Sequence, residues 1–374
     1  MHLSINHSVD TLMGMIKQLP IAKKMNAFAT VGDRELINFV SNDYLGLSDN
    51  KELKECVKSA IDVYGLGATG SRRLSGNHQL CLDVEAHIAK WVGKESGVLF
   101  NSGYQMNCAI FSTLVLEPCL ILTDKLIHAS IIDGIKNSGV QLVRFRHNDV
   151  THLGQLLAKH AHHKKHVIIV CESIYSMDGD MSPLHDIISL KKQYNATLIV
   201  DEAHSIGLYG ECGNGWVNEC NGIRDVDVVL LAFGKSFGLS GAMLLSTESV
   251  VELIKAKCRS YIYSTAMPLP VVCGIKKASE IIADAGSLIE QLRSNIKTFK
   301  KTIATNSCTQ IQPIIFKERQ NAERLEAHLL ENGFLCRSVH APTVPKSRLR
   351  ITLTAKHTSE QINMLTQTIG EWME

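Results

Sequence analysis

Short apolar stretches alternate with amphipathic stretches of helical length through most of the chain. The apolar stretches of strand length are Gly97–Phe100, Leu120–Thr123, Leu142–Phe145, Val167–Cys171, Leu198–Val200, Val226–Leu231 and Ala242–Leu245. Because helix-length segments separate most of them, the pattern predicts an α/β fold with a mostly parallel sheet that helices cover on both faces. Ligands of such sheets bind beyond the carboxyl ends of the strands. The residues that follow each stretch are therefore the first candidates for a site.

The segments that flank this pattern predict further elements. Residues 1–30 predict an amphipathic helix and a linker, and residues 36–40 predict a short strand. Residues 271–300 have the apolar spacing of one long helix. A strand, a helix, a strand and a helix are then predicted at Ile311–Phe316, Glu323–Asn332, Arg348–Thr354 and Thr358–Glu371.

We predict three parts from this order. Residues 1–45 form an N-terminal helix and short strand segment, residues 46–270 a large domain, and residues 271–374 a small C-terminal α/β domain. A chain of 374 residues is long enough for two or three such units.

Composition and charge narrow the class of protein. The formal net charge is only +2, so there is no electrostatic argument for binding nucleic acid or an anionic membrane. The sequence has neither an apolar stretch of about 18 residues nor a secretory leader pattern, so we expect no membrane span and no export. The 11 cysteines contain no Cys-x-x-Cys pair, which favours reduced thiols in the cytoplasm.

Lys235 is the most informative candidate. It follows an apolar stretch and stands between Gly234 and Gly238, and a buried lysine is costly unless its amine has a partner or a function. Asp201 and His204 follow the preceding apolar stretch. A lysine that forms an imine, with an aspartate facing a pyridine nitrogen, is the arrangement that holds pyridoxal phosphate. For Lys235 alone, a surface lysine in a glycine-rich turn is the alternative.

Other residues beyond strand ends also have both a functional and a structural interpretation. Gly103 stands where backbone N–H groups at a helix start could bind a phosphate, although a plain turn explains it equally well. His128 could stack on a planar cofactor or be a buried, hydrogen-bonded histidine. Asp178 and Asp180 suggest a calcium loop, but no glutamate closes it at the twelfth position. The histidines of residues 160–166 lack the ligand spacing of a zinc site.

Arg348 and Arg350 are two residues apart in a predicted strand, so both side chains face the same side of it. A guanidinium can grip a carboxylate through two parallel hydrogen bonds. The pair is therefore a candidate carboxylate site, and two solvent-facing arginines on an edge strand are the alternative.

Six motifs together resemble the α-oxoamine synthases, a family of fold-type I pyridoxal-phosphate enzymes. They are Asn42–Leu47, Gly65–Arg72, Asp124–Ser130, Glu172–Asp180, Asp201–Ser205 and Phe233–Gly238. Their order and spacing extend the resemblance over nearly the whole chain. It implies a pyridoxal-phosphate-dependent acyltransferase, with a large cofactor-binding domain around a mostly parallel sheet and a smaller C-terminal α/β domain.

Two further segments resemble one branch of this family, the 8-amino-7-oxononanoate synthases of biotin synthesis. These are Tyr261–Pro268 and Ala341–Pro345. The resemblance implies a condensation of L-alanine with a pimeloyl thioester and loss of CO2. One alternative is another synthase of the family, like glycine C-acetyltransferase, serine palmitoyltransferase or a signalling aminoketone synthase. A second alternative is a non-catalytic cofactor-binding subunit, but the presence of Lys235 and Asp201 argues against it. The acyl length and the carrier, coenzyme A or a carrier protein, stay open.

The family's catalytic roles map onto three residues of this chain. By resemblance, Lys235 forms an imine with the cofactor and Asp201 pairs with the pyridinium nitrogen. His128 is expected to stack on the ring and to assist the oxygen that becomes negative during the reaction.

The remaining cofactor contacts are likewise implied by the resemblance. Gly103 and Tyr104 are expected beside the phosphate, and Ser176 and His204 beside the phenolic oxygen of the ring.

The resemblance also implies a homodimer with shared sites. Ser264 and Thr265 are expected to reach the phosphate of the partner subunit. Asn42, Thr343 and Arg350 are expected to face the substrate, with Arg350 on the carboxylate of the amino acid.

Two positions depart from the family pattern. Ala232 stands where the family usually has a threonine or serine that donates to the phosphate, so one hydrogen bond of ~1 kcal/mol is missing. His340 stands where many oxononanoate synthases have an arginine, which leaves the acyl specificity less defined.

Overall fold

The computed structural model describes residues 20–25, 27–115, 119–161 and 166–373. Most of the predicted N-terminal amphipathic helix, and His162 and His163 of the histidine-rich stretch, lie outside these ranges. Within them, no helix combines the length and the apolar character needed to cross a bilayer.

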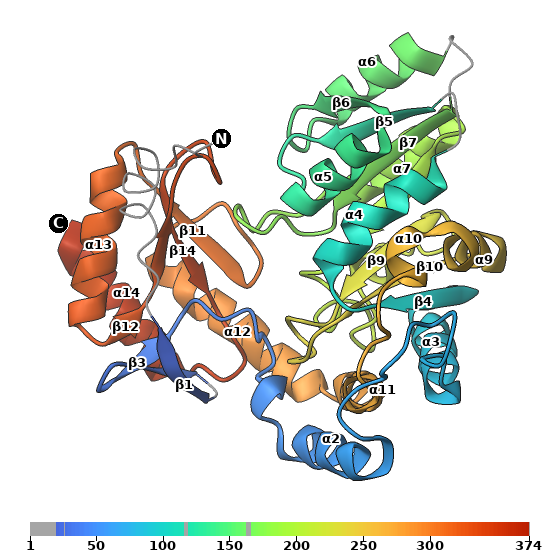
Figure 1. The fold of residues 1–374 in the computed structure, drawn as a ribbon. Helices are drawn as coiled ribbons and strands as arrows, with labels where there is room; N and C mark the ends of the chain where they lie inside the picture. Colours follow the sequence, from blue (N-terminus) through green and yellow to red (C-terminus); the bar gives the residue numbers. More distant parts are fainter. Residues whose placement is uncertain (1–19, 26, 116–118, 162–165, 374) are drawn as a thin grey trace, which may run out of the picture.

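A seven-stranded sheet forms the centre of the larger part of the molecule (Figure 1). Its strands are β4 (Ser96–Phe100), β5 (Cys119–Asp124), β6 (Gln141–Phe145), β7 (His166–Glu172), β8 (Thr197–Asp201), β9 (Val228–Ala232) and β10 (Ala242–Ser246). Their order is β4-β10-β9-β8-β7-β5-β6, and only β10 runs antiparallel to its neighbours. The predicted mostly parallel α/β fold is confirmed.

Helices cover both faces of this sheet because its strands are apolar on both sides. Along β9, Val229 and Leu231 face one apolar core, and Val228 and Leu230 face the other. The covering helices are α3 (Gln79–Val92), α4 (Gly103–Leu114), α5 (Ala129–Ser138), α6 (Val150–Ala161), α7 (Leu184–Gln193), α8 (Trp216–Glu219), α9 (Glu248–Lys257), α10 (Arg259–Ile262) and α11 (Leu269–Ala283). A further helix, α2 (Lys51–Tyr64), packs on α11.

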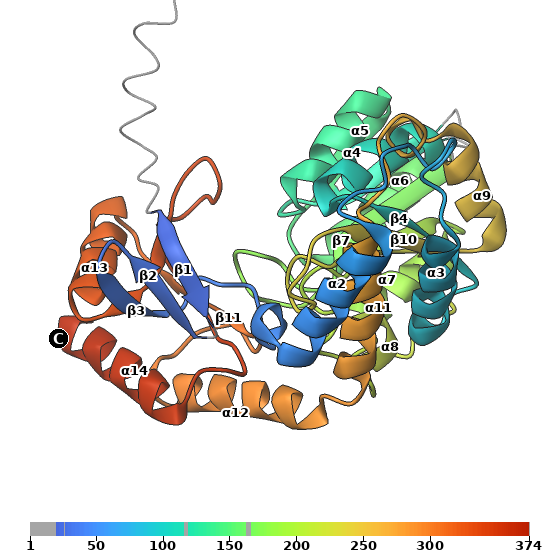
Figure 2. The same cartoon turned by 60° about the horizontal axis from the view of Figure 1, so that its bottom comes forward.

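The C-terminal elements form a second, smaller body, and α12 (Gly286–Thr302) leads into it (Figure 2). Its elements are β11 (Ile311–Ile315), α13 (Arg319–Glu331), β12 (Phe334–Leu335), β13 (Arg337–Val339), β14 (Arg348–Thr352) and α14 (Ser359–Met373). Strands β11, β14 and β13 make an antiparallel sheet with β14 in the middle. Arg350 is therefore on a central, buried strand, and the edge-strand alternative for this arginine is wrong.

The N-terminal strands belong to a sheet with the C-terminal body. Strands β1 (Ile21–Met25), β2 (Phe28–Val31) and β3 (Arg34–Asn38) form an antiparallel meander, and β3 pairs in parallel with β12. A helix and a linker were predicted over residues 1–30, and the presence of β1 and β2 shows that this was wrong for the last part of that range. Gly32, with φ +58°, and Asp33 form the two-residue turn between β2 and β3. A Gly-Asp pair between strand-forming residues is a recognised hairpin pattern.

The long helix predicted over residues 271–300 is in fact two helices. Helix α11 ends at Ala283, and α12 begins at Gly286. Asp284, with φ −98° and ψ 2°, leaves the helical conformation at the junction. Glycine, the poorest helix former after proline, follows at 286. The division at residues 45 and 270 stays a prediction.

Three adjacent strands bring polar side chains to one edge of the central sheet. Strand β7 ends at Glu172, β8 ends at Asp201, and β9 ends three residues before Lys235. Glu172 and Asp201 are direct partners in the β7–β8 register, so their side chains face the same side. This edge is where the order of strands places a site in an open α/β sheet.

Candidate active site

A cavity of about 180 Å³ lies at the carboxyl ends of β7, β8 and β9. It is lined by Gly103, Tyr104, Met106, Asn107, His128, Ser130, Glu172, Asp201, Ala203, His204, Leu231, Ala232 and Lys235. Six of the predicted cofactor residues are therefore gathered around one space, although they come from four separate segments of the sequence. They are Gly103, Tyr104, His128, Asp201, His204 and Lys235.

Asp201 is a buried carboxylate held in one orientation. Asp201 is 7% exposed and is the last residue of β8. Oδ1 accepts a hydrogen bond from the Ala203 amide at 2.9 Å, and Oδ2 accepts one from Nδ2 of Asn107 at 3.3 Å. Asn107 is one helical turn after Gly103, so α4 braces the carboxylate from the side. A negative charge is thus fixed at the wall of the cavity.

Lys235 lies in a tight turn after β9. Phe233 and Phe237 are fully buried on either side of it and anchor the turn in the core. Gly238 has φ +67°, and a Cβ there would collide with the backbone of Ser48, so only glycine fits. Burial lowers the pKa of the Lys235 amine to about 8, although Asp201 and Glu172 act to raise it. The amine therefore loses its proton far more readily than an exposed lysine does.

Glu172 is a cavity residue that the sequence reasoning missed. It is 3% exposed, and its Oε1 atom has no hydrogen-bond partner among the described residues. Burial raises the pKa of this carboxyl well above its usual value, and the charge of Asp201 adds to the effect. The register position opposite Asp201 could have identified it. Glu172 therefore holds its proton to a higher pH than an exposed glutamate does.

His128 is held as a neutral ring at the cavity. It caps the N-terminus of α5, where the Ser130 amide donates to Nδ1 at 3.3 Å. The Ser130 hydroxyl lies 2.7 Å from the same nitrogen and accepts from Asn107 at 3.0 Å. Because Nδ1 accepts, the ring carries its proton on Nε2. Desolvation lowers the pKa of His128, with Asp201 acting in the opposite direction. The ring is hydrogen-bonded and lines the cavity, but the residue is exposed rather than buried, and its stacking on a cofactor stays a prediction.

A chain of hydrogen bonds joins the cavity to the C-terminal sheet. Nδ1 of His204 lies 2.6 Å from the hydroxyl of Tyr44, which lies 3.2 Å from Oδ1 of Asn42. Nη2 of Arg350 donates to the same Asn42 oxygen at 3.1 Å. Burial lowers the pKa of His204 well below its usual value, so this ring is neutral. The structure thus links Asn42, His204 and Arg350, which lie far apart in the sequence.

Six predicted site residues are not among those that line the cavity: Asn42, Ser176, Ser264, Thr265, Thr343 and Arg350. Ser176 turns its carbonyl oxygen to Nε of Arg350 at 2.7 Å. Thr343 is exposed in the loop after β13, where its amide donates to the carbonyl of His340 at 3.0 Å. Neither side chain is brought to the cavity, because Ser176 lies past the end of β7 and Thr343 lies on the outer loop. Their contacts with cofactor and substrate stay predictions.

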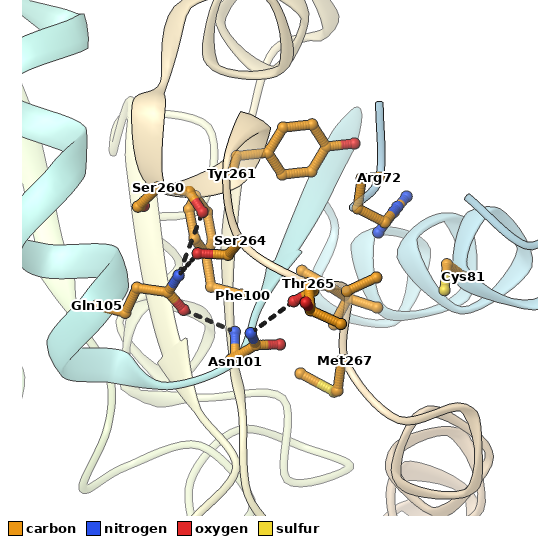
Figure 3. A pocket seen from close by; sticks show the side chains of 12 residues that line it. Arg72, Cys81, Phe100, Asn101, Gln105, Ser260, Tyr261, Ser264, Thr265 and Met267 are labelled. Carbon is orange, nitrogen blue, oxygen red and sulfur yellow. Dashed lines mark hydrogen bonds between the residues drawn. The ribbon is translucent and has the colours of Figure 1, made fainter. Parts of the chain in front are cut away.

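Ser264 and Thr265 line a different and much smaller pocket, of about 20 Å³ (Figure 3). Gln105 in the first turn of α4 donates to Oγ of Ser264 at 2.7 Å, and Nδ2 of Asn101 donates to the carbonyl of Thr265 at 2.9 Å. These contacts hold both residues beside the start of α4 but outside the larger cavity of their own chain. Their reach to a partner subunit stays a prediction.

The larger cavity fits pyridoxal phosphate. The N-terminus of α4 offers unpaired backbone N–H groups for a phosphate, and Gly103 lacks a side chain that would fill the space toward Ala232. Asp201 fits a protonated ring nitrogen, Lys235 an aldehyde carbon, and His128 a ring face. The buried Oδ1 atom of Asn107 also has no partner among the described residues. These groups have the donor and charge pattern that the cofactor requires.

Restoring a hydroxyl beside the phosphate position is expected to tighten cofactor retention. Ala232 lines the cavity, and a Cβ on Gly103 would come within 3.6 Å of the Ala232 methyl group. The variant Ala232→Thr should gain a hydrogen bond of ~1 kcal/mol, about fivefold in the dissociation constant. Equilibrium dialysis of the loaded protein measures this. Equal loss of cofactor from parent and variant would show that another group already makes the contact.

Comparison with known proteins agrees with this assignment. The sequence profile of the Aminotransferase class I and II family matches residues 34–369. A protein of Bacillus cereus (strain B4264), named provisionally as an 8-amino-7-oxononanoate synthase, is 37% identical over 355 residues, covering 92% of this chain and 90% of that protein. A Bacillus anthracis protein with the same name is 37% identical over 335 residues, covering 87% and 85%.

Solved structures show the same fold. A serine palmitoyltransferase variant from S. paucimobilis, with a bound PLP–myriocin aldimine, has a TM-score of 0.91 at 27% identity and covers 98% of this chain and 96% of its own. The 8-amino-7-oxononanoate synthase of Francisella tularensis has a TM-score of 0.79 at 28% identity, covering 91% and 99%. The chain therefore belongs to the Aminotransferase class I and II family, as a pyridoxal-phosphate-dependent acyltransferase of the α-oxoamine synthase type.

Proposed function

We propose that this enzyme condenses L-alanine with a pimeloyl thioester, with loss of CO2, to form 8-amino-7-oxononanoate. The observation that carries the proposal is the chain His204–Tyr44–Asn42–Arg350, which sets a guanidinium beside the Lys235 cavity. The names of the Bacillus and Francisella relatives support the choice of reaction.

Arg350 is prepared to bind the carboxylate of an amino acid. It donates from Nε to the Ser176 carbonyl at 2.7 Å, from Nη1 to Thr352 at 2.8 Å and from Nη2 to Asn42 at 3.1 Å. These bonds use three of its five N–H groups and leave one on each terminal nitrogen. Two parallel N–H groups are the fork that a carboxylate accepts in two-pronged fashion.

Bound pyridoxal phosphate supplies an electron sink that makes the Cα proton of an attached amino acid removable. Asp201 would hold a proton at the ring nitrogen, and the start of α4 would bind the phosphate. Nζ of Lys235 is placed to take the Cα proton, for which a pKa of about 8 suits it near neutral pH. Nε2–H of His128 is the donor for the oxygen that becomes negative when the thioester carbonyl is attacked.

The proposed enzyme is a homodimer in the cytoplasm. Ser264 and Thr265 would reach the phosphate of the partner subunit, since they line a pocket apart from the cavity of their own chain. Leu66, Leu74 and Tyr263 are 79%, 83% and 72% exposed, on two segments that a β-bridge between Ser71 and Thr265 joins, which favours burial against a second copy. All 11 cysteines lie within the described ranges, and none of them is in a disulfide, which suits a reducing compartment.

The variant Arg350→Lys is expected to raise the KM for the amino acid by about tenfold or more. Lysine keeps the positive charge but cannot reproduce the fork or the three hydrogen bonds that orient it. The absorbance of the cofactor–lysine imine should not change, because Lys235 is untouched. Steady-state kinetics with L-alanine, together with the spectrum of the resting enzyme, checks both parts. An unchanged KM would place the carboxylate elsewhere.

The substrate assignment is tested with a matrix of amino acids and thioesters. L-alanine, glycine and L-serine are each paired with pimeloyl, acetyl and palmitoyl thioesters of coenzyme A and of a carrier protein. We expect the highest kcat/KM for L-alanine with a pimeloyl group. A clear preference for glycine with acetyl-CoA would contradict the proposal.

A second candidate reaction is the condensation of L-serine with a long acyl thioester. It is favoured by the TM-score of 0.91 to the serine palmitoyltransferase, which exceeds the 0.79 to the Francisella enzyme. The same matrix separates the two, because a preference for serine with palmitoyl-CoA supports only this candidate.

A further inference from the structure

His147 lies outside the cavity, between two carboxylates that belong to different segments. Its Nδ1 atom is 2.9 Å from Oδ1 of Asp124 at the end of β5, and its Nε2 atom is 2.6 Å from Oδ2 of Asp180. The side chain of Asp124 is fully buried, while those of His147 and Asp180 are 24% and 33% exposed. Asn148 completes the cluster by donating from its backbone to Asp124 and from its amide to Asp180.

The two carboxylates determine the charge of His147. A carboxylate only accepts hydrogen bonds, so each ring nitrogen must donate, and the ring is an imidazolium. Burial acts to lower the pKa of His147, but the hydrogen bonds to Asp124 and Asp180 outweigh it and raise the pKa to about 10. His147 therefore keeps both of its donors throughout the neutral range.

Asp180 is part of a closed loop, residues 173–182, that follows β7. The amide of Tyr175 donates to the carbonyl of Asp180 at 3.0 Å, and the amide of Gly179 donates to the carbonyl of Tyr175 at 2.8 Å. The ring of His147 also packs edge-on against Tyr175, with 4.6 Å between ring centroids. His147 thus contacts this loop at two residues, Asp180 and Tyr175.

The other side of the same loop contacts Arg350, the arginine that is proposed to bind the substrate carboxylate. The carbonyl of Ser176, next to Tyr175, accepts the Nε–H of Arg350 at 2.7 Å. Arg348 donates to the Met177 carbonyl at 2.9 Å and to Oδ1 of Asp178 at 2.7 Å. The loop is therefore fixed by His147 toward β5 and is itself a support for both arginines of β14.

We propose that His147 is a positioning residue for the amino-acid substrate, because it fixes the loop whose Ser176 carbonyl orients the guanidinium of Arg350. This rests on the proposed role of Arg350 in binding the substrate carboxylate. The path runs from the imidazolium through Asp180 and the bond between Asp180 and Tyr175 to Ser176. A guanidinium that loses this support turns away from the position in which its two remaining N–H groups meet the carboxylate.

The test replaces His147 with glutamine, which is neutral and cannot donate to both carboxylates. We expect the KM for L-alanine to rise about tenfold, because a displacement near 1 Å in a supporting group can cost up to about a hundredfold and this loop keeps its other contacts. The kcat value, the affinity for pyridoxal phosphate and the absorbance of the lysine imine should stay within about twofold. The control is His87→Gln, because His87 also links two elements, through a 3.0 Å hydrogen bond to Ser279, but lies far from the loop.

A second measurement isolates the carboxylate. Ethylamine is L-alanine without its carboxylate, so its binding to the loaded enzyme, followed by absorbance, should be the same in parent and His147→Gln. Selective loss of L-alanine binding supports the proposal. Equal weakening of both ligands, or a fall in kcat with an unchanged KM, would overturn it and point to a role through His128 or through general stability.

Asp180→Asn is the variant to use if His147→Gln does not fold, since it keeps the shape of a partly exposed side chain. It should raise the KM for L-alanine about threefold. The double variant, with both His147→Gln and Asp180→Asn, should have a KM no higher than that of His147→Gln alone, because the two groups act through the same interaction. Additive effects would overturn the proposal. An error in the proposed substrate is distinguishable, because it appears as a different preferred amino acid in the parent enzyme.

Discussion

Replacing Lys235 with alanine is expected to abolish turnover, with a loss of at least about a thousandfold in kcat. The amine of Lys235 has its pKa lowered to about 8 by burial and faces Asp201 in the cavity. It is both the group that holds the cofactor covalently and the proposed base at Cα. Pyridoxal phosphate should still bind weakly to the variant through the start of α4 and Asp201.

The measurement combines product formation with absorbance near ~420 nm, where a lysine imine absorbs and from which borohydride removes it. Lys94 is the matched control, because burial also lowers its pKa to about 8, but its amine donates to the carbonyl of Ile223. Borohydride should attach the cofactor to the peptide that contains Lys235 and not to the one that contains Lys94. Product formation at the parental rate by Lys235→Ala would refute the assignment.

Asp201→Asn is expected to lower kcat by about two orders of magnitude or more while the fold persists. An asparagine oxygen can still accept from the Ala203 amide, so the local backbone keeps its bond. Without the negative charge, a proton on the ring nitrogen is no longer stabilised, and the electron sink weakens. Asp201 also acts to raise the pKa of Lys235, so its loss should lower that pKa further.

A matched control is available at the opposite edge of the sheet, at Asp227 just before β9 begins. Asp227 accepts the Leu198 amide at 2.7 Å, as Asp201 accepts that of Ala203, but it lies outside the cavity. Asp227→Asn should retain kcat within a few-fold, with any change confined to thermal stability. If Asp201→Asn also stayed within a few-fold of the parent, its carboxylate would have no role at the ring nitrogen.

Features set by local sequence were predicted well. The strands of the central sheet coincide with the short apolar stretches, and Asp201 ends one such strand while Lys235 lies three residues after another. Because parallel strands share one carboxyl edge, both residues were expected at that edge, whereas the neighbouring positions of β8 and β9 became known only from the structure. Glu172 was missed because a glutamate at a strand end does not show which neighbour it faces until the register is known.

Features that depend on distant segments were not predictable in this way. The bond between Arg350 and Asn42 joins residues 308 positions apart, and no local pattern specifies it. The same holds for His147, whose two carboxylate partners come from the end of β5 and from the loop after β7. The break between α11 and α12 was missed for a different reason. The apolar residues on either side of Ala283 to Gly286 continue at helical spacing, so the pattern of the sequence shows no interruption there.

The pairing of β3 with β12 has a consequence for how the chain folds during synthesis. It joins Ile37 to Phe334, so the first strands emerge from the ribosome about 300 residues before their partner. At roughly 5–20 residues per second, β3 keeps an unpaired edge for roughly 15–60 s. The central sheet, whose strands all lie between, can form in that interval. Asn42 and Arg350 meet only after the last strands are released, so the pocket for the substrate carboxylate is the last part of the site to assemble.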